Sequence, residues 1–494
     1  MTSPSTTCPE ACRILLIGGG GREHALAWKL SQSPRCEALF ATDIENGGIA
    51  ALAQPCPHPW NPLNTFPLET WCEKQGINLV IVGPEAPLSE GIADALAAPG
   101  RVVFGPKRAA AALEADKGFA KTLMKQVAVP TAEGRVFTTP NTARRYVLRG
   151  IERDLEAAGL LAEAAPLTEF MASADDRGAV DMPEVTQAIW KILEERDEPC
   201  VVKATGLAAG KGVIVCRNTA AALSAIDTIM CDKTFGDAGK TILIEELLEG
   251  QEVSVLALVD GRTVWVLDPC QDHKQVGEGD TGPNTGGMGA YCPTPIMTES
   301  LLETVEQQVL LPIIDGLRRD EIEYRGVLYA GLMMTPAGPK VLEFNCRFGD
   351  PECQPLMTRL QGDLVELLWA TANGSLESLE MDFDDQVSCC VVMCSEGYPG
   401  SYEKGLPIEG IEEAEASAPG AITVFHAGTR IDETGRLVTS GGRVLGVNAK
   451  AATLSEARDL ANAACDCIRF PGAFWRHDIG CRLDQDVTTS SSRS

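Results

Sequence analysis

The sequence predicts an α/β protein of several domains whose N-terminal part is a doubly wound parallel sheet. Three observations lead to this fold class. The chain has 494 residues, which at roughly 100–200 residues per domain predicts three or four domains. Residues 13–30 combine a strand, a run of glycines and a helix, which is how a parallel βα unit begins. Two more apolar strands, within 77–88 and 101–106, end in Gly-Pro, so we expect a parallel sheet over about 13–110.

The first βα turn, within RILLIGGGGREHALAWKL, is rich in glycine but does not match the dinucleotide-binding fingerprint. The last glycine of G-x-G-x-x-G falls on Glu23, and no downstream acid for a ribose is evident. A dehydrogenase is therefore disfavoured. The turn is either a tight structural connection or part of a ligand site at the carboxyl end of the sheet, where open α/β sheets bind their ligands.

Two helical stretches follow the first sheet. Residues 112–134 are predicted to form a helix, with Asp116 near its start and Pro130 beyond its end. Residues 141–198 are charge-rich and helical in pattern, and they carry no obvious chemistry. A charge-rich stretch of this kind is typical of a solvated helical excursion.

The stretch VVKATGLAAGKGVIV, residues 201–215, predicts a strand, a glycine turn and a second strand that carry Lys203 and Lys211. It is not a P-loop, because Gly206 and Gly210 are one residue too close and no Ser or Thr follows Lys211. The glycines would let backbone N–H groups approach phosphate oxygens. An ordinary flexible hairpin with two solvated lysines is the alternative.

The rest of the chain is predicted from apolar runs and turn residues. The glycine-rich stretch DHKQVGEGDTGPNTGGMGAY, residues 272–291, has almost no apolar content and predicts a loop, and a loop this long is usually functional or disordered. The other expected elements are two strands around an acidic link at 241–261, a strand pair at 327–334 and 340–348, short strands and turns after about 375, a helix at 453–468, and a frayed tail at 490–494.

The composition excludes several classes of protein. The net charge is −27, from 42 Lys+Arg against 69 Asp+Glu, whereas general nucleic-acid binding needs a basic surface. A few local lysines and a metal can still hold phosphorylated metabolites. No run of 18 apolar residues predicts a membrane span, and the first residues lack the features of a signal peptide. The 18 cysteines show no metal-binding spacing and fit reduced, buried thiols in a cytosolic protein.

Polar residues alternate in LEFNCRFGDPE, residues 342–352. On a strand, Glu343, Asn345 and Arg347 share one face. A carboxylate and an amide oxygen suit a hard cation such as Mg²⁺, and a guanidinium beside them suits the phosphates that such a cation binds. An ordinary surface strand, which also alternates polar and apolar residues, is the alternative, but the apolar neighbours favour a cleft over an outer face.

The acidic link EELLEGQE supplies a further candidate. Glu245 and Glu246 end one strand and Glu252 begins the next, so the link can offer backbone groups to an adenine edge and a carboxylate to ribose hydroxyls. Lysines precede it on a helix (Lys117) and on the hairpin (Lys203). Together with the Glu-Asn-Arg strand, these parts indicate a nucleotide clamped between two sheets.

At this point the chain resembles a known family. The order Lys117, Lys203, EELLEGQE and EFNCRF is similar to that of the ATP-grasp superfamily. The segments GGGGREHALAWKL, VGPEAPL, KATGLAAGKGV, QDHK, GPNTGGMGAY and EFNCRFGDPE resemble the glycinamide ribonucleotide synthetase family, over about residues 13–480. The resemblance implies an ATP-dependent ligase of purine synthesis, in which ATP phosphorylates the carboxylate of glycine and the amine of 5-phosphoribosylamine attacks the glycyl phosphate.

The resemblance also implies an architecture. We expect an N-terminal α/β domain at 13–115, an ATP-grasp domain at 116–373 and a small mixed C-terminal domain at 374–485. The flap subdomain would cover about 131–247 and contain a helical insertion at about 138–198. A cytoplasmic monomer is expected, with Mg²⁺ or Mn²⁺ as cofactor, ATP, glycine and 5-phosphoribosylamine as small-molecule partners, and neither nucleic acid nor membrane.

The resemblance assigns site residues by group. The expected catalytic residues are Arg347, Lys203 and Lys211, and the metal ligands are Glu343 and Asn345. The expected ATP-binding residues are Lys117, Lys203, Gly206, Gly210, Lys211, Gly212, Glu245, Glu246, Leu247 and Glu252. The expected substrate-binding residues are Gly19, Gly20, Gly21, Arg22, Glu23, Asp280, Asn284, Thr285, Gly286, Gly287 and Arg347. The glycines of 206–212 and the 277–289 loop would let both segments close over the site and exclude water.

The chain departs from the family pattern at several positions. Thr205 replaces the usual Asp, Asp116 the usual Ser and Gln251 a common Glu, and DIENGG at 43–48 replaces a Pro-Gly-Asn loop. About forty extra residues lie within 138–198 and are expected to form helices away from the phosphates.

Two other functions stay open at this stage. Another ATP-grasp ligase, such as a biotin-carboxylase-like or purine-ribonucleotide carboxylase, is disfavoured by GPNTGGMGAY and CRFGDPE. A nucleotide-binding regulatory module without catalysis is disfavoured by the presence of the lysines and of the Glu-Asn-Arg set.

Overall fold

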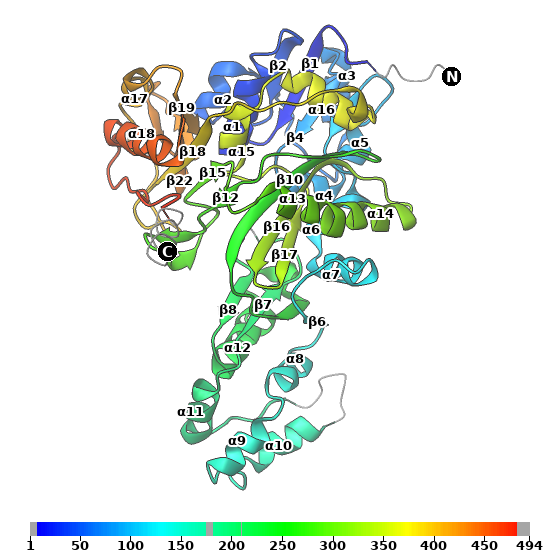
Figure 1. Ribbon diagram of the computed structural model, residues 1–494, viewed down its shortest axis with the longest axis vertical. Coiled ribbons are helices and arrows are strands. Elements are labelled where there is room, and N and C mark those ends of the chain that lie inside the picture. The colour runs from blue at the N-terminus through cyan, green and yellow to red at the C-terminus, as the bar shows by residue number, and fades with distance from the viewer. Residues whose placement is uncertain (1–6, 174–180, 209, 482–494) are drawn as a thin grey trace. The chain divides into compact units, whose positions relative to one another are not determined.

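The computed structural model describes residues 7–173, 181–208 and 210–481. The predicted tail at 490–494 lies outside these residues. The chain forms two compact units (Figure 1), which are described separately below. The first unit contains residues 1–112, 251–332 and 343–494, and the second contains 113–250 and 333–342.

The first unit begins with the expected parallel sheet, whose strand order is β3-β2-β1-β4-β5. The strands are β1 Cys12–Ile17, β2 Cys36–Ala41, β3 Gln54–Pro55, β4 Leu79–Val82 and β5 Val102–Phe104. The helices are α1 Gly21–Leu30, α2 Gly47–Leu52, α3 Phe66–Gln75, α4 Glu85–Glu90, α5 Ile92–Leu96 and α6 Arg108–Ala115, whose last three residues belong to the second unit. Strands β1 and β4 are buried along nearly their whole length, as their continuous apolar runs predict for a covered parallel sheet.

A second sheet has the order β11-β10-β16-β17. Its strands are β10 Gln251–Asp260, β11 Val264–Val266, β16 Arg325–Thr335 and β17 Gly338–Asn345. The predicted strand pair at 327–334 and 340–348 is confirmed as β16 and β17. Helices α13 Glu299–Val305, α14 Leu311–Arg319, α15 Cys353–Arg359 and α16 Leu364–Asn373 accompany this part of the chain.

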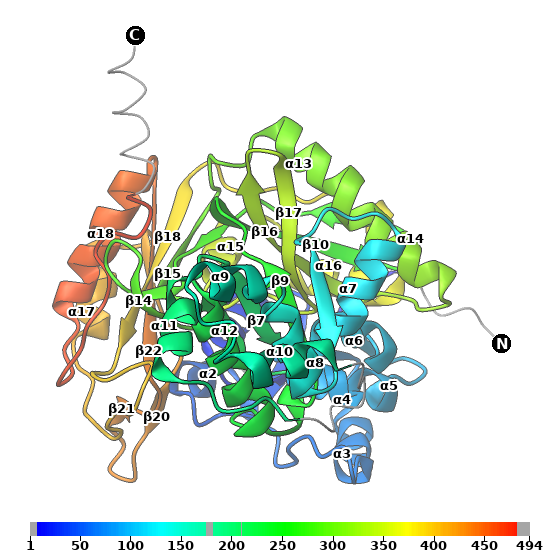
Figure 2. The same ribbon diagram turned by 90° about the horizontal axis from the view of Figure 1, so that it is seen from below.

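The C-terminal strands join a third sheet of order β12-β15-β18-β22-β19. Its strands are β12 Gln271–Asp272, β15 Gly289–Cys292, β18 Val387–Cys394, β19 Ile422–His426 and β22 Arg443–Ala451. Helices α17 Ile411–Ser417 and α18 Leu454–Cys467 pack on β18, β19 and β22 (Figures 1 and 2). Strands β20 Thr429–Ile431 and β21 Leu437–Thr439 form a separate pair.

The stretch 272–291, predicted as a loop, contains strand structure instead. Strands β13 Gln275–Gly277 and β14 Thr281–Asn284 form an antiparallel hairpin, and β12 and β15 flank it. The prediction was wrong because the hairpin has few apolar residues, so no hydrophobic alternation marks its strands. Its backbone pairing and contacts with C-terminal side chains hold it.

The second unit contains an antiparallel sheet of order β6-β9-β7-β8. The strands are β6 Gly134–Phe137, β7 Cys200–Ala204, β8 Val213–Cys216 and β9 Ile242–Glu246. The predicted strand–turn–strand at 201–215 is therefore confirmed. The helices are α7 Lys117–Gln126, α8 Pro140–Val147, α9 Ile151–Ala157, α10 Ala165–Ala172, α11 Gln187–Glu195 and α12 Thr219–Ile226.

The helix predicted at 112–134 is broken at Asp116. This residue has an extended backbone, and its carboxylate accepts from the N–H groups of Gly118 at 2.8 Å and Phe119 at 3.2 Å. Asp116 is thus the N-cap of α7, which begins at Lys117, and α6 ends at the preceding residue, Ala115. Asp caps helices as well as Ser does, so the replacement of the usual family Ser preserves this function.

The predicted insertion is helical over its described residues but is not merely solvated. Leu155, Leu167 and Phe170 are at most 2% exposed. They belong to the same apolar cluster as Val202 of β7 and Ile244 of β9. The insertion therefore shares its core with the sheet of the second unit. Residues 174–180 lie outside the description.

No helix within the described ranges has the length and apolar character needed to cross a membrane.

Candidate active site

In the second unit, two predicted ATP-binding residues form a buried ion pair. Lys203 of β7 is 6% exposed, and its ammonium lies 2.6 Å from Glu245 Oε2. The ammonium also donates to the carbonyl oxygen of Leu342 at 3.2 Å. Leu342 immediately precedes Glu343 in β17.

Glu245 has a second ammonium partner, Lys121 of α7, which sequence analysis missed. Lys121 is 2% exposed and donates to Thr131 Oγ1 at 2.9 Å and to the Ala132 carbonyl at 2.6 Å. Burial lowers the pKa of Lys121, against the opposing effect of the Glu245 carboxylate. Its position four residues after Lys117 on an amphipathic helix was the only signal for it.

The hairpin turn carries the remaining lysine of the flap. Lys211 is exposed, while Gly210 has a φ of +75°, a conformation that glycine adopts without strain. A Cβ at Gly206 would lie 2.7 Å from the Ala238 Cα, and one at Gly212 would lie 2.7 Å from the Ala208 Cβ. Close packing therefore requires glycine at these two positions, and the backbone conformation favours it at Gly210. Residue 209 is outside the description.

Thr205, which replaces the usual family Asp, anchors the base of the flap. Its N–H and its hydroxyl both donate to the Thr241 carbonyl, at 3.1 and 3.2 Å. Its own carbonyl accepts from the Lys117 N–H at 2.9 Å. This side chain thus joins the start of the flap to the segment before β9, and its backbone joins the flap to the first residue of α7.

The acidic link divides into buried and exposed carboxylates. Glu245 is buried, Leu247 is half-buried, and Glu246 is exposed. Glu246 accepts from the Glu133 N–H and from the Lys340 ammonium, both at 2.9 Å. Both hydrogen bonds lower the pKa of Glu246, and the one from the Glu133 N–H has the larger effect. Glu245 is therefore engaged in internal ion pairs, and its contact with ATP stays a prediction.

In the first unit, Glu343 and Asn345 lie at the end of β17 and Arg347 follows them. The Arg347 Nη2 donates to Asn345 Oδ1 at 3.4 Å, and its Nε lies 3.5 Å from Glu85 Oε2. Arg347 also lowers the pKa of Glu85 against the effect of burial. The guanidinium is thus brought beside the Asn345 amide oxygen, and Glu343 lies two residues before Asn345 on the same strand.

These donors fit a hard divalent cation. Both are oxygen ligands, and the Glu343 side chain is 32% exposed, so its carboxylate is accessible. The Lys274 ammonium lies 4.0 Å from Glu343 Oε1 and 3.0 Å from Glu252 Oε2, which places a positive charge beside the carboxylates. Within the described ranges, no cluster of three His, Cys, Asp or Glu residues is spaced for a metal. A cation here would complete its shell with phosphate and water oxygens.

The N-terminal glycine turn is held by its own polar residues. Glu23 Oε2 accepts from the Gly20 N–H at 2.6 Å, and Glu23 Oε1 accepts from Arg22 Nε at 2.6 Å. Arg22 also donates to the Phe348 carbonyl at 3.0 Å. A Cβ at Gly83 would lie 2.0 Å from Glu23 Oε1, so the carboxylate fills the space between the two turns. Contact of Arg22 and Glu23 with substrate stays a prediction.

The predicted substrate loop is held by C-terminal side chains. Asp280 pairs with Arg476 at 3.0 Å, and Arg476 is only 1% exposed. The Gly286 carbonyl accepts from Arg443 at 2.6 Å, and the Gly286 N–H donates to the Tyr398 hydroxyl at 3.1 Å. The other predicted residues of this loop are the exposed Asn284, the half-buried Thr285, which donates twice to the Lys274 carbonyl, and the buried Gly287.

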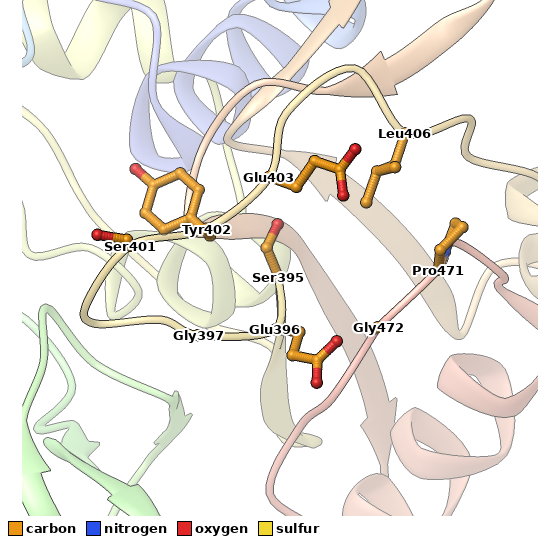
Figure 3. A pocket seen from close by; sticks show the side chains of 9 residues that line it. All are labelled: Ser395, Glu396, Gly397, Ser401, Tyr402, Glu403, Leu406, Pro471 and Gly472. Atoms are coloured by element: carbon orange, nitrogen blue, oxygen red, sulfur yellow. The ribbon is translucent and has the colours of Figure 1, made fainter.

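A separate pocket of about 420 Å³ lies in the C-terminal part of the first unit (Figure 3). Glu396 and Glu403 line it together with Tyr402, and it contains no Lys or Arg. None of the predicted site residues lines this pocket, and its acidic lining does not suit a phosphate.

Family models place the chain among known proteins. Models of phosphoribosylglycinamide synthetase match residues 12–114 (N domain), 169–353 (ATP-grasp domain) and 388–482 (C domain). A phosphoribosylamine–glycine ligase of Rhodopirellula baltica is 45% identical over 470 residues, which cover 94% of this chain and 96% of the relative.

Solved structures agree on the fold. The phosphoribosylamine–glycine ligase of Thermotoga maritima superposes with a TM-score of 0.69 at 26% identity, covering 94% of this chain and 100% of that one. A biotin carboxylase domain of Hydrogenobacter thermophilus, solved with MgADP and bicarbonate, superposes at 0.62 with 15% identity over 94% and 92% of the two chains, which is a likeness of fold alone. The chain belongs to the phosphoribosylglycinamide synthetase family of ATP-grasp ligases.

Proposed function

We propose that this chain joins glycine to 5-phospho-D-ribosylamine at the expense of ATP, in purine biosynthesis. A carboxylate oxygen of glycine attacks the γ-phosphorus of ATP and ADP leaves, which gives glycyl phosphate. The amine of 5-phosphoribosylamine then attacks the acyl carbon. The bond between that carbon and the bridging oxygen breaks, phosphate leaves with this oxygen, and the amine loses a proton. The products are N1-(5-phospho-D-ribosyl)glycinamide, ADP and phosphate. The observation that carries the proposal is the 45% identity to a ligase of this name over nearly the whole chain.

Charged and polar groups in each of the two units support this chemistry. Glu343 and Asn345 would hold Mg²⁺, which supplies positive charge to the transferring phosphoryl group. Lys203 is fixed by Glu245 and by the Leu342 carbonyl, so its ammonium is already oriented before nucleotide binds. Arg347 lies beside Asn345 and can bind a phosphate oxygen in addition.

Water has to be kept from the glycyl phosphate, because acyl phosphates hydrolyse. We assign this role to the flap at 206–212 and to the 277–289 segment. The exposed Lys211 and the left-handed backbone of Gly210 support closure of the flap. In the 277–289 segment, Asp280 is paired with Arg476, and Gly286 is bonded to Arg443 and Tyr398, so movement of this segment would require release of these contacts.

The finer assignments rest on the same family membership. We infer Mg²⁺ as the usual cofactor with Mn²⁺ as a substitute, a cytoplasmic location and a monomeric state. We also infer three domains at 13–115, 116–373 and 374–485, which the three matched family models support.

The test is release of ADP with purified full-length chain and Mg²⁺. Glycine together with 5-phosphoribosylamine should be required, and bicarbonate should not replace glycine. With glycine labelled by ¹⁸O in its carboxylate, one labelled oxygen should appear in the released phosphate. ADP release that depends on bicarbonate would favour the carboxylase alternative, and binding of ATP without turnover would favour the regulatory module. Lys203→Ala should raise the KM for ATP and lower kcat by about 100-fold or more.

A further inference from the structure

Two cysteines near the start of the described chain lie in contact. The Sγ atoms of Cys8 and Cys12 are 3.9 Å apart, and both residues are free thiols. A disulfide holds its two sulfurs about 2 Å apart, so these sulfurs would have to approach each other by roughly 2 Å. Residues 8–11 belong to no helix or strand, so this approach does not require regular structure to break.

The two thiols differ in their exposure to solvent. Cys8 is half-buried, so it is the one that a small molecule can reach, whereas Cys12 is 0% exposed. Cys12 is the first residue of β1, and its N–H donates to the Arg35 carbonyl at 2.7 Å, which fixes its position. An accessible thiol beside a second thiol that can resolve it is the arrangement found at oxidation-sensitive cysteines.

A guanidinium lies beside both thiols and favours a thiolate there. Arg35 Nη1 donates to the Pro9 carbonyl at 3.2 Å, within the segment that joins the two cysteines. The hydrogen bond with Cys8 lowers the pKa of Cys12 against the effect of burial, and the charge of Arg35 acts in the same direction. Either sulfur can be the donor, so the negative charge left by the loss of one proton can also lie on Cys8. The thiolate is the form of cysteine that reacts with oxidants.

The charge of Arg35 is only partly neutralised by its own acidic neighbours. The nearest oxygens of Glu10, Asp363 and Glu366 lie 3.8, 3.7 and 3.6 Å from guanidinium nitrogens. These three distances are longer than a hydrogen bond, so the guanidinium stays available to a neighbouring thiolate.

Cys36 is a second thiol close to Cys12, because the two residues are register partners in the parallel strands β1 and β2. Burial raises the pKa of Cys36 to about 11, so this thiol stays protonated near neutral pH. Both backbones are held in the sheet, whereas Cys8 precedes it. Cys8 is therefore the better partner for Cys12.

We propose that Cys8 and Cys12 are a site of reversible oxidation, at which hydrogen peroxide converts the two thiols into an intrachain disulfide. The Cys8 sulfur attacks one peroxide oxygen, the O–O bond breaks, and water leaves, which gives a sulfenic acid on Cys8. The Cys12 sulfur then attacks the Cys8 sulfur, the S–O bond breaks, and a second water leaves. The two thiols lose two electrons and two protons, and the peroxide is reduced to two waters. Exchange with a reducing dithiol reverses the reaction. The proposal is independent of the proposed function.

Peptide mapping of the full-length chain tests this site. The reduced protein is exposed to hydrogen peroxide, denatured in N-ethylmaleimide, which blocks the remaining thiols, and digested with trypsin. The tryptic peptide that ends at Arg13 contains both cysteines. The disulfide makes this peptide about 2 Da lighter than its reduced form and free of the blocking group, and dithiothreitol should restore the reduced form. Cys270 and Cys292 also interact with each other but are both buried, so they are the matched control pair and should stay reduced in the same sample.

Two results with the wild type would overturn the proposal. One is the blocking group on both Cys8 and Cys12 at a peroxide concentration that oxidises the exposed Cys231. The other is a disulfide that links the peptide ending at Arg13 to the peptide that contains Cys36.

Variants test the two roles separately. Cys12→Ser should leave the sulfenic acid on Cys8, where dimedone traps it, and Cys8→Ser should slow oxidation of the buried Cys12 at least about tenfold. Cys467→Ser, at another half-buried position, is the matched control and should leave the rate of disulfide formation unchanged. If Cys12→Ser fails to fold, Cys8→Ser decides the proposal, and undiminished oxidation of Cys12 in that variant overturns it.

Discussion

Substitution of Glu245 by Gln should destabilise the second unit more than its conservative nature implies. Glu245 is 4% exposed and its carboxylate accepts from the ammonium groups of both Lys121 and Lys203. Glutamine has one carbonyl oxygen and an NH₂ group that only donates. Its oxygen can accept a hydrogen bond from one lysine ammonium, and the other ammonium then faces N–H groups.

The size of the destabilisation depends on the hydrogen-bond acceptors that each lysine keeps after the substitution. Removing one partner of a buried ion pair costs about 3–5 kcal/mol, because an uncompensated charge stays buried. Lys121 keeps Thr131 Oγ1 and the Ala132 carbonyl, and Lys203 keeps the Leu342 carbonyl. These neutral acceptors offset part of the loss. We therefore expect the lower end of the range, about 3 kcal/mol.

Hydrogen exchange of the backbone amides in β7 and β9 measures this loss locally, without requiring the whole chain to unfold in one step. A loss of about 3 kcal/mol corresponds to exchange that is roughly 150-fold faster. The adjacent Glu246→Gln is the matched control. Glu246 is exposed and pairs with Lys340, so its substitution should cost at most about 1 kcal/mol, or roughly fivefold in exchange.

Equal exchange rates in the two variants would refute the reasoning, because burial of Glu245 would then contribute nothing. A double variant adds a second criterion. Lys121→Met removes one of the stranded charges, so Lys121→Met combined with Glu245→Gln should cost at least about 1 kcal/mol less than the sum of the two single changes. Strict additivity would contradict the ion-pair account.

Three further predictions concern other parts of the molecule. Glu343→Ala should reduce Mg²⁺-dependent turnover about 100-fold or more and weaken Mn²⁺ binding measured by electron paramagnetic resonance. The circular dichroism spectrum should be unchanged, and full turnover of the variant would remove the assignment of Glu343 as a metal ligand. Burial lowers the pKa of His24 to about 3, and its Nδ1 accepts from the His426 backbone N–H at 2.7 Å. As the pH decreases below about 6.5, this histidine is protonated in the unfolded chain but not in the folded one, so the free energy of unfolding falls. His24→Asn should remove about 1.4 kcal/mol per pH unit of this dependence in urea unfolding between pH 6 and pH 5, and an unchanged slope would exclude His24. Phe170→Ala should cost about 3–5 kcal/mol in thermal unfolding because Phe170 is 2% exposed, whereas Leu161→Ala, at 41% exposure, should change little; equal effects would mean that the insertion has no packed core.

The sequence predicted those elements whose pattern is local. The β7–β8 hairpin was predicted because β-branched runs flank a glycine turn, and the parallel strands because continuous apolar runs end in glycine. The alternation of Glu343, Asn345 and Arg347 predicted a shared face for the same reason. A strand of period two needs no knowledge of the rest of the chain.

The partners of these residues could not be predicted, because they come from distant segments. Lys121 meets Glu245 across 124 residues of sequence, and no pattern around either residue encodes that contact. The prediction that the insertion is merely solvated was wrong for a related reason. Its charged residues indicate solvent exposure, while Leu167 and Phe170 pack with β-strand residues that follow it in the chain.

The substrate loop is the clearest case of support from a distance. The β13–β14 hairpin lacks an apolar face, so it cannot be stable on its own. Arg476 donates to the Gln275 carbonyl and to Asp280, and Arg443 donates to the Gly286 carbonyl, so two arginines near the C-terminus hold both ends of the segment. The turn between the two strands is held as well, because the Gly279 N–H donates to Asp478 Oδ2 at 2.8 Å and His477 pairs with Glu278 at 2.9 Å. The C-terminal part of the first unit thus supports the segment that we assign to substrate binding.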